Sequence, residues 1–163
     1  MKKKSEQYNH LIRCFPEVEL PQIISKDYIL DYSRHNPTIN GLLLEEYFYK
    51  WDQEIDEYVE FIPCFRFKFE KLDCIVYHKS SLLKYEFYLV TLDDSENLIS
   101  RKIIAGMISN GKETIQSAAT ITPDHCIHIA GAYVKDGLFV GNDSSQNYME
   151  IMPDGKIISI KDE

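Results

Sequence analysis

Hydrophobic and polar residues alternate along much of the chain after residue 60, with the period of two that is typical of β-strands. The clearest alternation covers residues 61–70. Its apolar positions are Phe61, Phe65, Phe67 and Phe69, and the opposite face carries Cys64, Arg66, Lys68 and Glu70. This pattern predicts a strand with one face on a core and the other face toward solvent.

A central hairpin is predicted over residues 84–106. Residues 85–92 are aromatic, β-branched or leucine, except for Glu86, which is typical of a pleated and half-buried surface. Both faces are apolar in the second half of this segment, so we expect it to be a central strand. The polar run 93–97 supplies turn residues, and the return strand begins near Leu98.

Further strands are predicted at residues 73–79, 114–122, 125–134, 148–152 and 156–160. Turn residues separate them at Ser80–Ser81, Asn110–Gly111, Lys135–Gly137 and Pro153–Gly155. The polar run 141–147 is predicted to be a loop. The strands begin about a dozen residues apart, which favours an antiparallel meander with short turns.

The first 60 residues predict helices and an extended segment. Ser25 is a predicted N-cap for a helix over residues 26–34, and the apolar stripe of a second helix covers residues 42–51. The stripe consists of Leu44, Tyr47, Phe48 and Trp51. Pro16 and Pro21 rule out a regular helix between residues 11 and 24, where Val18, Leu20 and Ile23 are expected to pin an extended segment to the core. Residues 1–10 are polar and are expected to be frayed.

These patterns predict an α+β fold that is mostly β, in a single domain over residues 1–163. An N-terminal part over residues 1–60, with two short helices, packs on an antiparallel meander of about seven or eight strands over residues 61–163. The length suffices for one domain with a sizeable core. The meander is expected to form a curled sheet or a partly closed barrel.

The charge of the chain narrows the range of partners. A formal net charge of −8, from 26 acidic and 18 basic residues, disfavours nucleic acid and anionic membrane surfaces and permits a basic protein partner. No apolar run approaches the length of a transmembrane helix, and no apolar core follows the basic start of the chain. We therefore expect a cytoplasmic protein whose four cysteines are reduced.

Cysteines and histidines on two predicted strands are candidates for metal binding. Cys126 and His128 share a strand face at about 7 Å, whereas about 13 Å separates Cys74 from His78. A zinc ion takes about four such ligands, so only one of Cys74 and His78 could join the other two. No C-x-x-C, H-E-x-x-H, G-x-S-x-G or glycine-rich phosphate-binding spacing is present. We therefore expect no metal, cofactor or catalytic residue, and ordinary buried thiols and histidines.

Two classes of function stay open. Five of the nine residues from 52 to 60 are carboxylates, and they are the candidate binding residues: Asp52, Glu54, Asp56, Glu57 and Glu60. They favour a non-enzymatic interaction module, such as an inhibitor or immunity-like protein, that docks a basic partner on an acidic surface. The alternative is a ligand-binding or enzymatic β-roll with a pocket of His, Cys and Tyr side chains. A deep pocket containing His78, His128 or Cys126 would favour this alternative.

Overall fold

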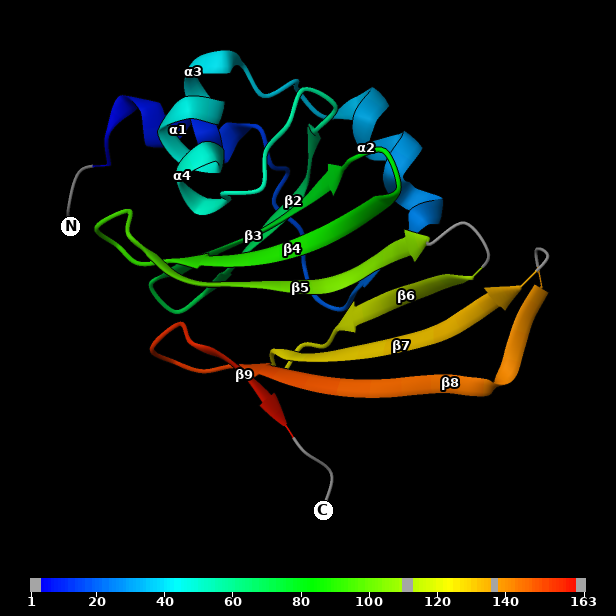
Figure 1. Cartoon of the computed structure of the whole chain (residues 1–163). Coiled ribbons are helices and arrows are strands. Elements are labelled where there is room, and N and C mark those ends of the chain that lie inside the picture. The colour runs from blue at the N-terminus through cyan, green and yellow to red at the C-terminus, as the bar shows by residue number, and fades with distance from the viewer. Residues whose placement is uncertain (1–3, 110–112, 136–137, 161–163) are drawn as a thin grey trace.

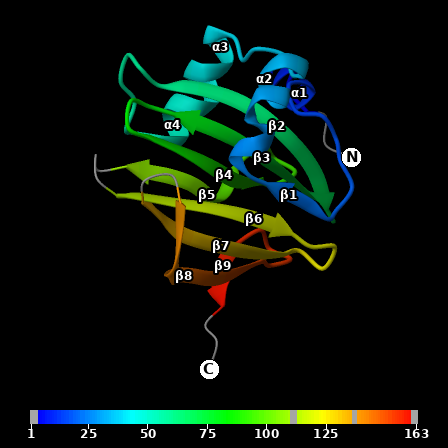
Figure 2. The ribbon, with the colours of Figure 1, turned by 90° about the vertical axis from the view of Figure 1, so that its right-hand side faces the viewer.

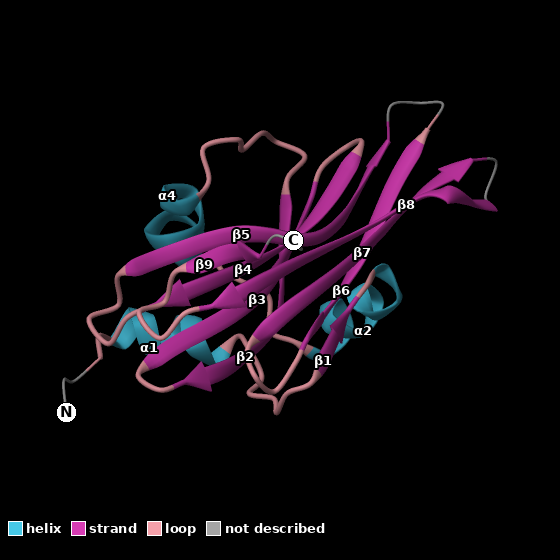
Figure 3. Cartoon of the chain, turned by 90° about the horizontal axis from the view of Figure 1, so that it is seen from below, coloured by secondary structure: helices cyan, strands magenta, loops and turns pink. Residues whose placement is uncertain are grey.

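The computed structural model describes residues 4–109, 113–135 and 138–160, and it confirms the predicted α+β fold. One nine-stranded, antiparallel sheet curls without closing, and short helices cover one of its faces (Figure 1). Figure 3 shows these helices behind the sheet when the molecule is seen from below. The turn predicted at Asn110–Gly111 lies outside the described residues, as do the last two residues of the turn predicted at Lys135–Gly137. Within the described part of the chain, no helix is long and apolar enough to cross a membrane.

The helical elements all precede residue 52. They are α1 (Glu6–Arg13), the 3-10 turn η1 (Lys26–Tyr28), α2 (Ile29–His35), α3 (Gly41–Leu43), the π-helical turn η2 (Leu44–Phe48) and α4 (Tyr49–Trp51). The strands are β1 (Gln22–Ile24), β2 (Glu60–Phe69), β3 (Leu72–Ser80), β4 (Lys84–Leu92), β5 (Leu98–Ser109), β6 (Thr114–Ile121), β7 (Cys126–Lys135), β8 (Leu138–Ile151) and β9 (Ile157–Ile160).

Both predicted helices are present, with side-chain caps. The Ser25 hydroxyl accepts a hydrogen bond from the backbone N–H of Asp27 at the start of η1–α2. Asn40 caps the continuous helical stretch 41–51, since its Oδ1 accepts from Leu43 N at 2.9 Å. The predicted apolar stripe faces the core, with Phe48 fully buried and Leu44, Tyr47 and Trp51 packed beside it.

The prediction of a frayed segment was wrong for residues 6–10, because they form α1 (Glu6–Arg13). The helix also includes residues 11–13, where the two prolines were expected to exclude a regular helix; it ends before Pro16. Ser5 caps this helix, and Tyr8 and Leu11 on its inner face are buried. The Tyr8 hydroxyl donates to Asp73 Oδ2 on β3 at 2.5 Å, which ties the helix to the sheet. The polar composition concealed the helix, since only a narrow stripe of this short element touches the core.

The strands follow one another across the sheet in chain order from β2 to β9. β6 is the branch point, because its first half pairs with β5 and its second half pairs with β1 (Figure 2). The sequence predicted that Ile23 packs on the core, and this prediction was wrong by one residue. In β1, Ile24 is fully buried, whereas Ile23 is 53% exposed.

The loop predicted at residues 141–147 is instead part of β8. Its residues pair with β7, as in the register partners Gly131↔Ser145 and Ile129↔Asn147. On its other side, β8 pairs with β9 only over Tyr148–Ile151. The polar residues Ser145, Gln146 and Asn147 are exposed, so a polar composition is compatible with this strand.

Two apolar cores lie on opposite faces of strands β3 and β4. The first fills the curl of the sheet, and its fully buried members include Cys64, Val76, Phe87, Leu89 and Ile127. The second lies between the sheet and the helices, and its members include Leu11, Phe48, Ile75, Tyr77 and Val90. β3 and β4 therefore have apolar residues on both faces, as the sequence predicted for the central hairpin.

Candidate docking site

The acidic segment 52–60 joins α4 to β2 on the side of the sheet that carries the helices (Figure 1). The sequence predicted that all five carboxylates of this segment are exposed binding residues. For the first of them, Asp52, this prediction was wrong, because its side chain is buried. Asp52 Oδ2 lies 2.5 Å from Lys79 Nζ and 3.1 Å from Arg101 Nη2. The side chains of Lys79 and Asp52 are only 3% and 4% exposed. Asp52 therefore anchors the segment internally and is not available to a partner.

Aromatic rings surround this buried ion pair. Arg101 Nε donates to the Tyr77 hydroxyl at 3.1 Å, and its guanidinium carbon lies 4.3 Å from the centroid of the Tyr88 ring. Tyr77 and Tyr88 stack on one another at 5.2 Å. Burial raises the pKa of Tyr77 to about 12, so this hydroxyl stays protonated and neutral at physiological pH.

The other four carboxylates of the segment are exposed: Glu54, Asp56, Glu57 and Glu60. The segment that displays them is held in place, because Lys79 Nζ donates to the Glu54 carbonyl at 2.8 Å and Asp56 Oδ1 accepts from Tyr58 N at 2.8 Å. Glu54 lies 3.6 Å from Lys84, which partly offsets its charge. Tyr58 stands 53% exposed among these acids.

A cleft of about 370 Å³ opens beside the acidic segment, between the end of α2 and the start of β2. Its apolar lining comprises Pro37, Ile39, Leu44, Val59, Phe61, Ile62 and Pro63, and the remaining lining residues are Ser33, Thr38 and Glu60. Glu60 thus belongs to both the acidic segment and the cleft. A cleft with a mostly apolar lining and one carboxylate, next in the chain to a segment with three more exposed carboxylates, has the composition of a site for an apolar side chain flanked by basic residues.

The cysteine and histidine candidates do not come together. Cys126 and His128 lie on the outer face of β7, whereas Cys74 and His78 are buried on the inner face of β3. In the described part of the chain, no three His, Cys, Asp or Glu side chains are placed to hold a metal ion. The strand positions were predicted correctly, but the curl of the sheet puts the two pairs on different surfaces.

The thiols are poorly suited to nucleophilic chemistry. Burial raises the pKa of Cys14, Cys64 and Cys74, to about 12 for Cys74, which disfavours the reactive thiolate. Burial and the neighbouring carboxylate of Asp124 also raise the pKa of Cys126, whose Sγ lies 3.7 Å from Asp124 Oδ2. No thiol in the described chain has a lowered pKa.

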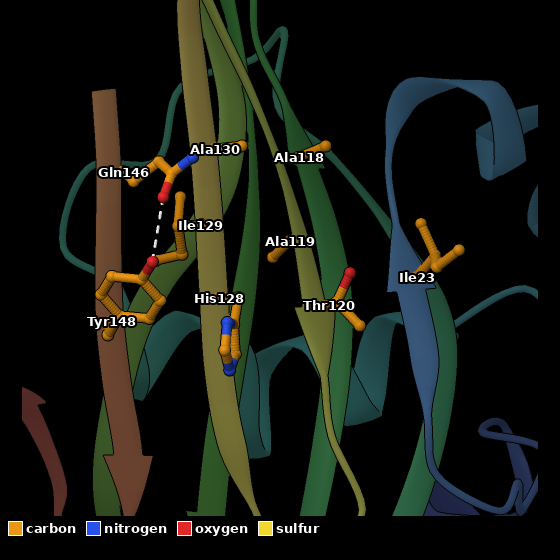
Figure 4. A pocket seen from close by; sticks show the side chains of 9 residues that line it. All are labelled: Ile23, Ala118, Ala119, Thr120, His128, Ile129, Ala130, Gln146 and Tyr148. Carbon is orange, nitrogen blue, oxygen red and sulfur yellow. Dashed lines mark hydrogen bonds between the residues drawn. The ribbon is translucent and has the colours of Figure 1, made fainter. Parts of the chain in front are cut away.

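A smaller cavity of about 250 Å³ lies on the outer face of β6–β8 (Figure 4). Ile23 and Tyr148 stand at its two ends, and alanines line much of its floor. The Tyr148 hydroxyl donates to Gln146 Oε1 at 2.9 Å, and the rings of His128 and Tyr148 meet edge to face at 4.9 Å. Of the three residues that would mark a ligand pocket, only His128 lines this groove.

Sequence reasoning missed the cleft and the buried ion pair. The cleft is assembled from residues 33–44 and 59–63, and none of these residues forms a motif. Lys79 offered a weak signal, since it closes a predicted strand whose middle, Cys74–Tyr77, is apolar, but a lysine at the end of a strand is ordinarily expected to face solvent. Comparisons with protein-family models, with curated protein sequences and with solved structures found no match.

Proposed function

We propose that this protein is a non-enzymatic interaction module that docks a basic protein partner, in the manner of an inhibitor or immunity-like protein. The observation that carries the proposal is the apolar cleft at the rim of the acidic segment, with Glu60 common to both. An apolar side chain of the partner enters the cleft, and flanking lysines or arginines meet Glu54, Asp56 and Glu57.

The two parts of the surface would contribute differently. Burial of an apolar anchor in the cleft supplies most of the affinity, as in other interfaces with a small number of dominant side chains. The exposed carboxylates attract the partner at long range and raise the association rate, and this effect is screened by salt. The buried ion pair of Asp52 with Lys79 keeps the segment in one conformation, which reduces the entropy lost on binding.

Affinity purification of the full chain from its own host tests this proposal. The variant Glu54→Gln/Glu57→Gln/Glu60→Gln removes three exposed charges and leaves the Asp56 turn intact. The matched control Glu19→Gln/Asp31→Asn/Glu45→Gln removes three exposed charges elsewhere. We expect the wild type and the control to retain the same basic partner, and the first variant to lose most of it. Equal retention by all three proteins would contradict the proposal.

The groove in Figure 4 favours a second candidate function, the binding of a small polar ligand, because His128, Gln146 and Thr120 surround its apolar floor. Its volume of about 250 Å³ is suited to a fragment-sized molecule. Screening a library of small fragments by NMR tests this alternative. Binding that is abolished by His128→Ala would support it, and no shift at β6–β8 would exclude it.

A further inference from the structure

Strand β5 has a free edge in the middle of the sheet. It pairs with β4 from Leu98 to Ile108, but on its other side β6 pairs only with Gly106–Ser109. Among the described residues, Leu98–Ala105 therefore have no neighbouring strand on that side. Such an edge presents backbone N–H and C=O groups that can pair with an added strand.

β9 is the last strand of the sheet, and its outer edge faces the free edge of β5. At one end the two strands are in contact, since Ile157 N on β9 donates to Ser100 Oγ on β5 at 3.2 Å. The turn before β9 is also tied to β4, because the Thr91 hydroxyl donates to the Gly155 carbonyl at 2.6 Å. Beyond this point the strands diverge, and Figure 1 shows β9 turning away below β5.

A cavity of about 620 Å³ lies between the two diverging strands, and we call it the wedge. The wedge is lined by Ile103, Ile104, Ala105, Ser117, Ile129, Gln146, Asn147, Tyr148, Met149, Ser159 and Ile160. None of these side chains is charged. Ile103 and Ile160 are 47% and 39% exposed, so apolar surface stands open at the mouth of the wedge.

Strand direction determines what can fill the wedge. Each of the four steps from β5 to β9 is antiparallel, so β5 and β9 run in the same direction. One strand placed between them, antiparallel to both, would continue the alternation and close β5–β9 into a six-stranded barrel. We infer that the wedge accepts an extended segment of a partner protein as this missing strand. This binding mode is β-augmentation.

The occupant is a segment of another protein and not of a second copy of this chain. The missing strand needs both of its edges free, because it pairs with β5 and with β9 at once, and every strand in the described residues already uses at least one edge in the sheet. The outer edge of β2 is also covered, since Val18 N donates to the Arg66 carbonyl and the Asn36 side chain donates to the Pro63 carbonyl. The partner segment is uncharged and places small apolar side chains inward, against Ala105, Ile129 and Met149.

Selection of linear peptides tests this inference independently of the acidic segment. A phage-displayed library of random short peptides is selected on the full chain, and the enriched peptides are assayed against two variants. Ser159→Trp fills the wedge, whereas Ile158→Trp places the same side chain on the opposite face of β9. We expect about tenfold or greater loss of affinity for Ser159→Trp and little change for Ile158→Trp.

Amide hydrogen exchange of the wild-type complex provides a readout that does not depend on either variant. Bound peptide is expected to protect amides in Leu98–Ala105 and in β9 together, because the added strand pairs with both edges. Three results would overturn the inference: no enrichment of any peptide, equal binding to Ser159→Trp, or protection confined to other strands. These results leave the proposed docking site at residues 54–60 untouched, so the two proposals fail separately.

Discussion

At the scale of single residues, the interior of the protein contains charged and polar side chains of types that are rarely buried. Lys79 and Asp52 form a buried ion pair, and His78 is buried with neither ring nitrogen hydrogen-bonded within the described chain. Buried charges are tolerated only when they are paired, because the cost of removing an ion from water is large. Removing one member of the buried ion pair is therefore expected to lower the free energy of unfolding more than removing an exposed charge.

Replacing Asp52 tests the structural role assigned to it. Asp52→Asn leaves the buried ammonium of Lys79 without its carboxylate, so we expect a loss of about 3–5 kcal/mol in the free energy of unfolding. Urea denaturation measures this value. Glu54→Gln is the control, since an exposed charge contributes within about 1 kcal/mol. If the two variants are equally stable, Asp52 does not anchor the acidic segment.

His78 makes the stability depend on pH. Burial lowers its pKa from the ordinary 6.5 to about 4, so the unfolded chain takes up a proton more readily than the folded one. Above pH 6.5 His78 is neutral in both states and does not reduce the stability. As the pH falls toward 4, the unfolded chain binds the proton first, so the free energy of unfolding decreases by about 3 kcal/mol at most. Comparing His78→Phe with the wild type over this range isolates the effect. Parallel stability curves would show that His78 does not titrate in this way.

At the scale of elements, the mostly polar residues 6–13 form helix α1, whose inner face packs on the core. Leu11 of α1 is completely buried, so Leu11→Ala is expected to lower the free energy of unfolding by about 2–5 kcal/mol. Asn9→Ala, on the exposed side of the same helix, is expected to change it by less than about 0.5 kcal/mol. Thermal or urea unfolding distinguishes the two. A small effect of Leu11→Ala would mean that α1 does not pack as described.

The turn before β9 depends on a glycine. Gly155 has φ +95°, and a Cβ there would lie 2.5 Å from Ile99 Cδ1. Gly155→Ala is therefore expected to cost about 1–3 kcal/mol and to loosen β9 from β5, which faster amide exchange in β9 would report. Gly41→Ala is the matched control, since no atom lies within 4 Å of its added Cβ. Unchanged exchange in β9 would contradict the role given to this turn.

The sequence predicted those elements that depend on local pattern. The strand over residues 61–70 and the caps Ser25 and Asn40 are encoded over a few residues, although only Ser25 was predicted as a cap. The faces predicted for this strand were wrong at its start, because the register shifts between Pro63 and Phe65. Phe61 packs on the core under the helices, whereas Phe65 lies in the other core together with Cys64, which was expected on the solvent face. The ion pair of Asp52 with Lys79 and Arg101 was not predictable, because its partners come from the end of α4, from β3 and from β5. The cleft and the wedge depend in the same way on contacts between distant segments.

At the scale of the whole molecule, the curl of the sheet produces two separate surfaces. The helices cover one face and leave the acidic segment with its cleft at their margin. The open side of the curl leaves the wedge between β5 and β9. Both surfaces offer apolar pockets with polar borders.

Native mass spectrometry of the protein purified from its own host, without chelator, tests the central claim most directly. Docking of a basic protein partner predicts a retained complex whose chemical crosslinks map to residues 54–60. A retained small molecule or metal ion in place of a protein would contradict that claim and would direct attention to the groove at His128.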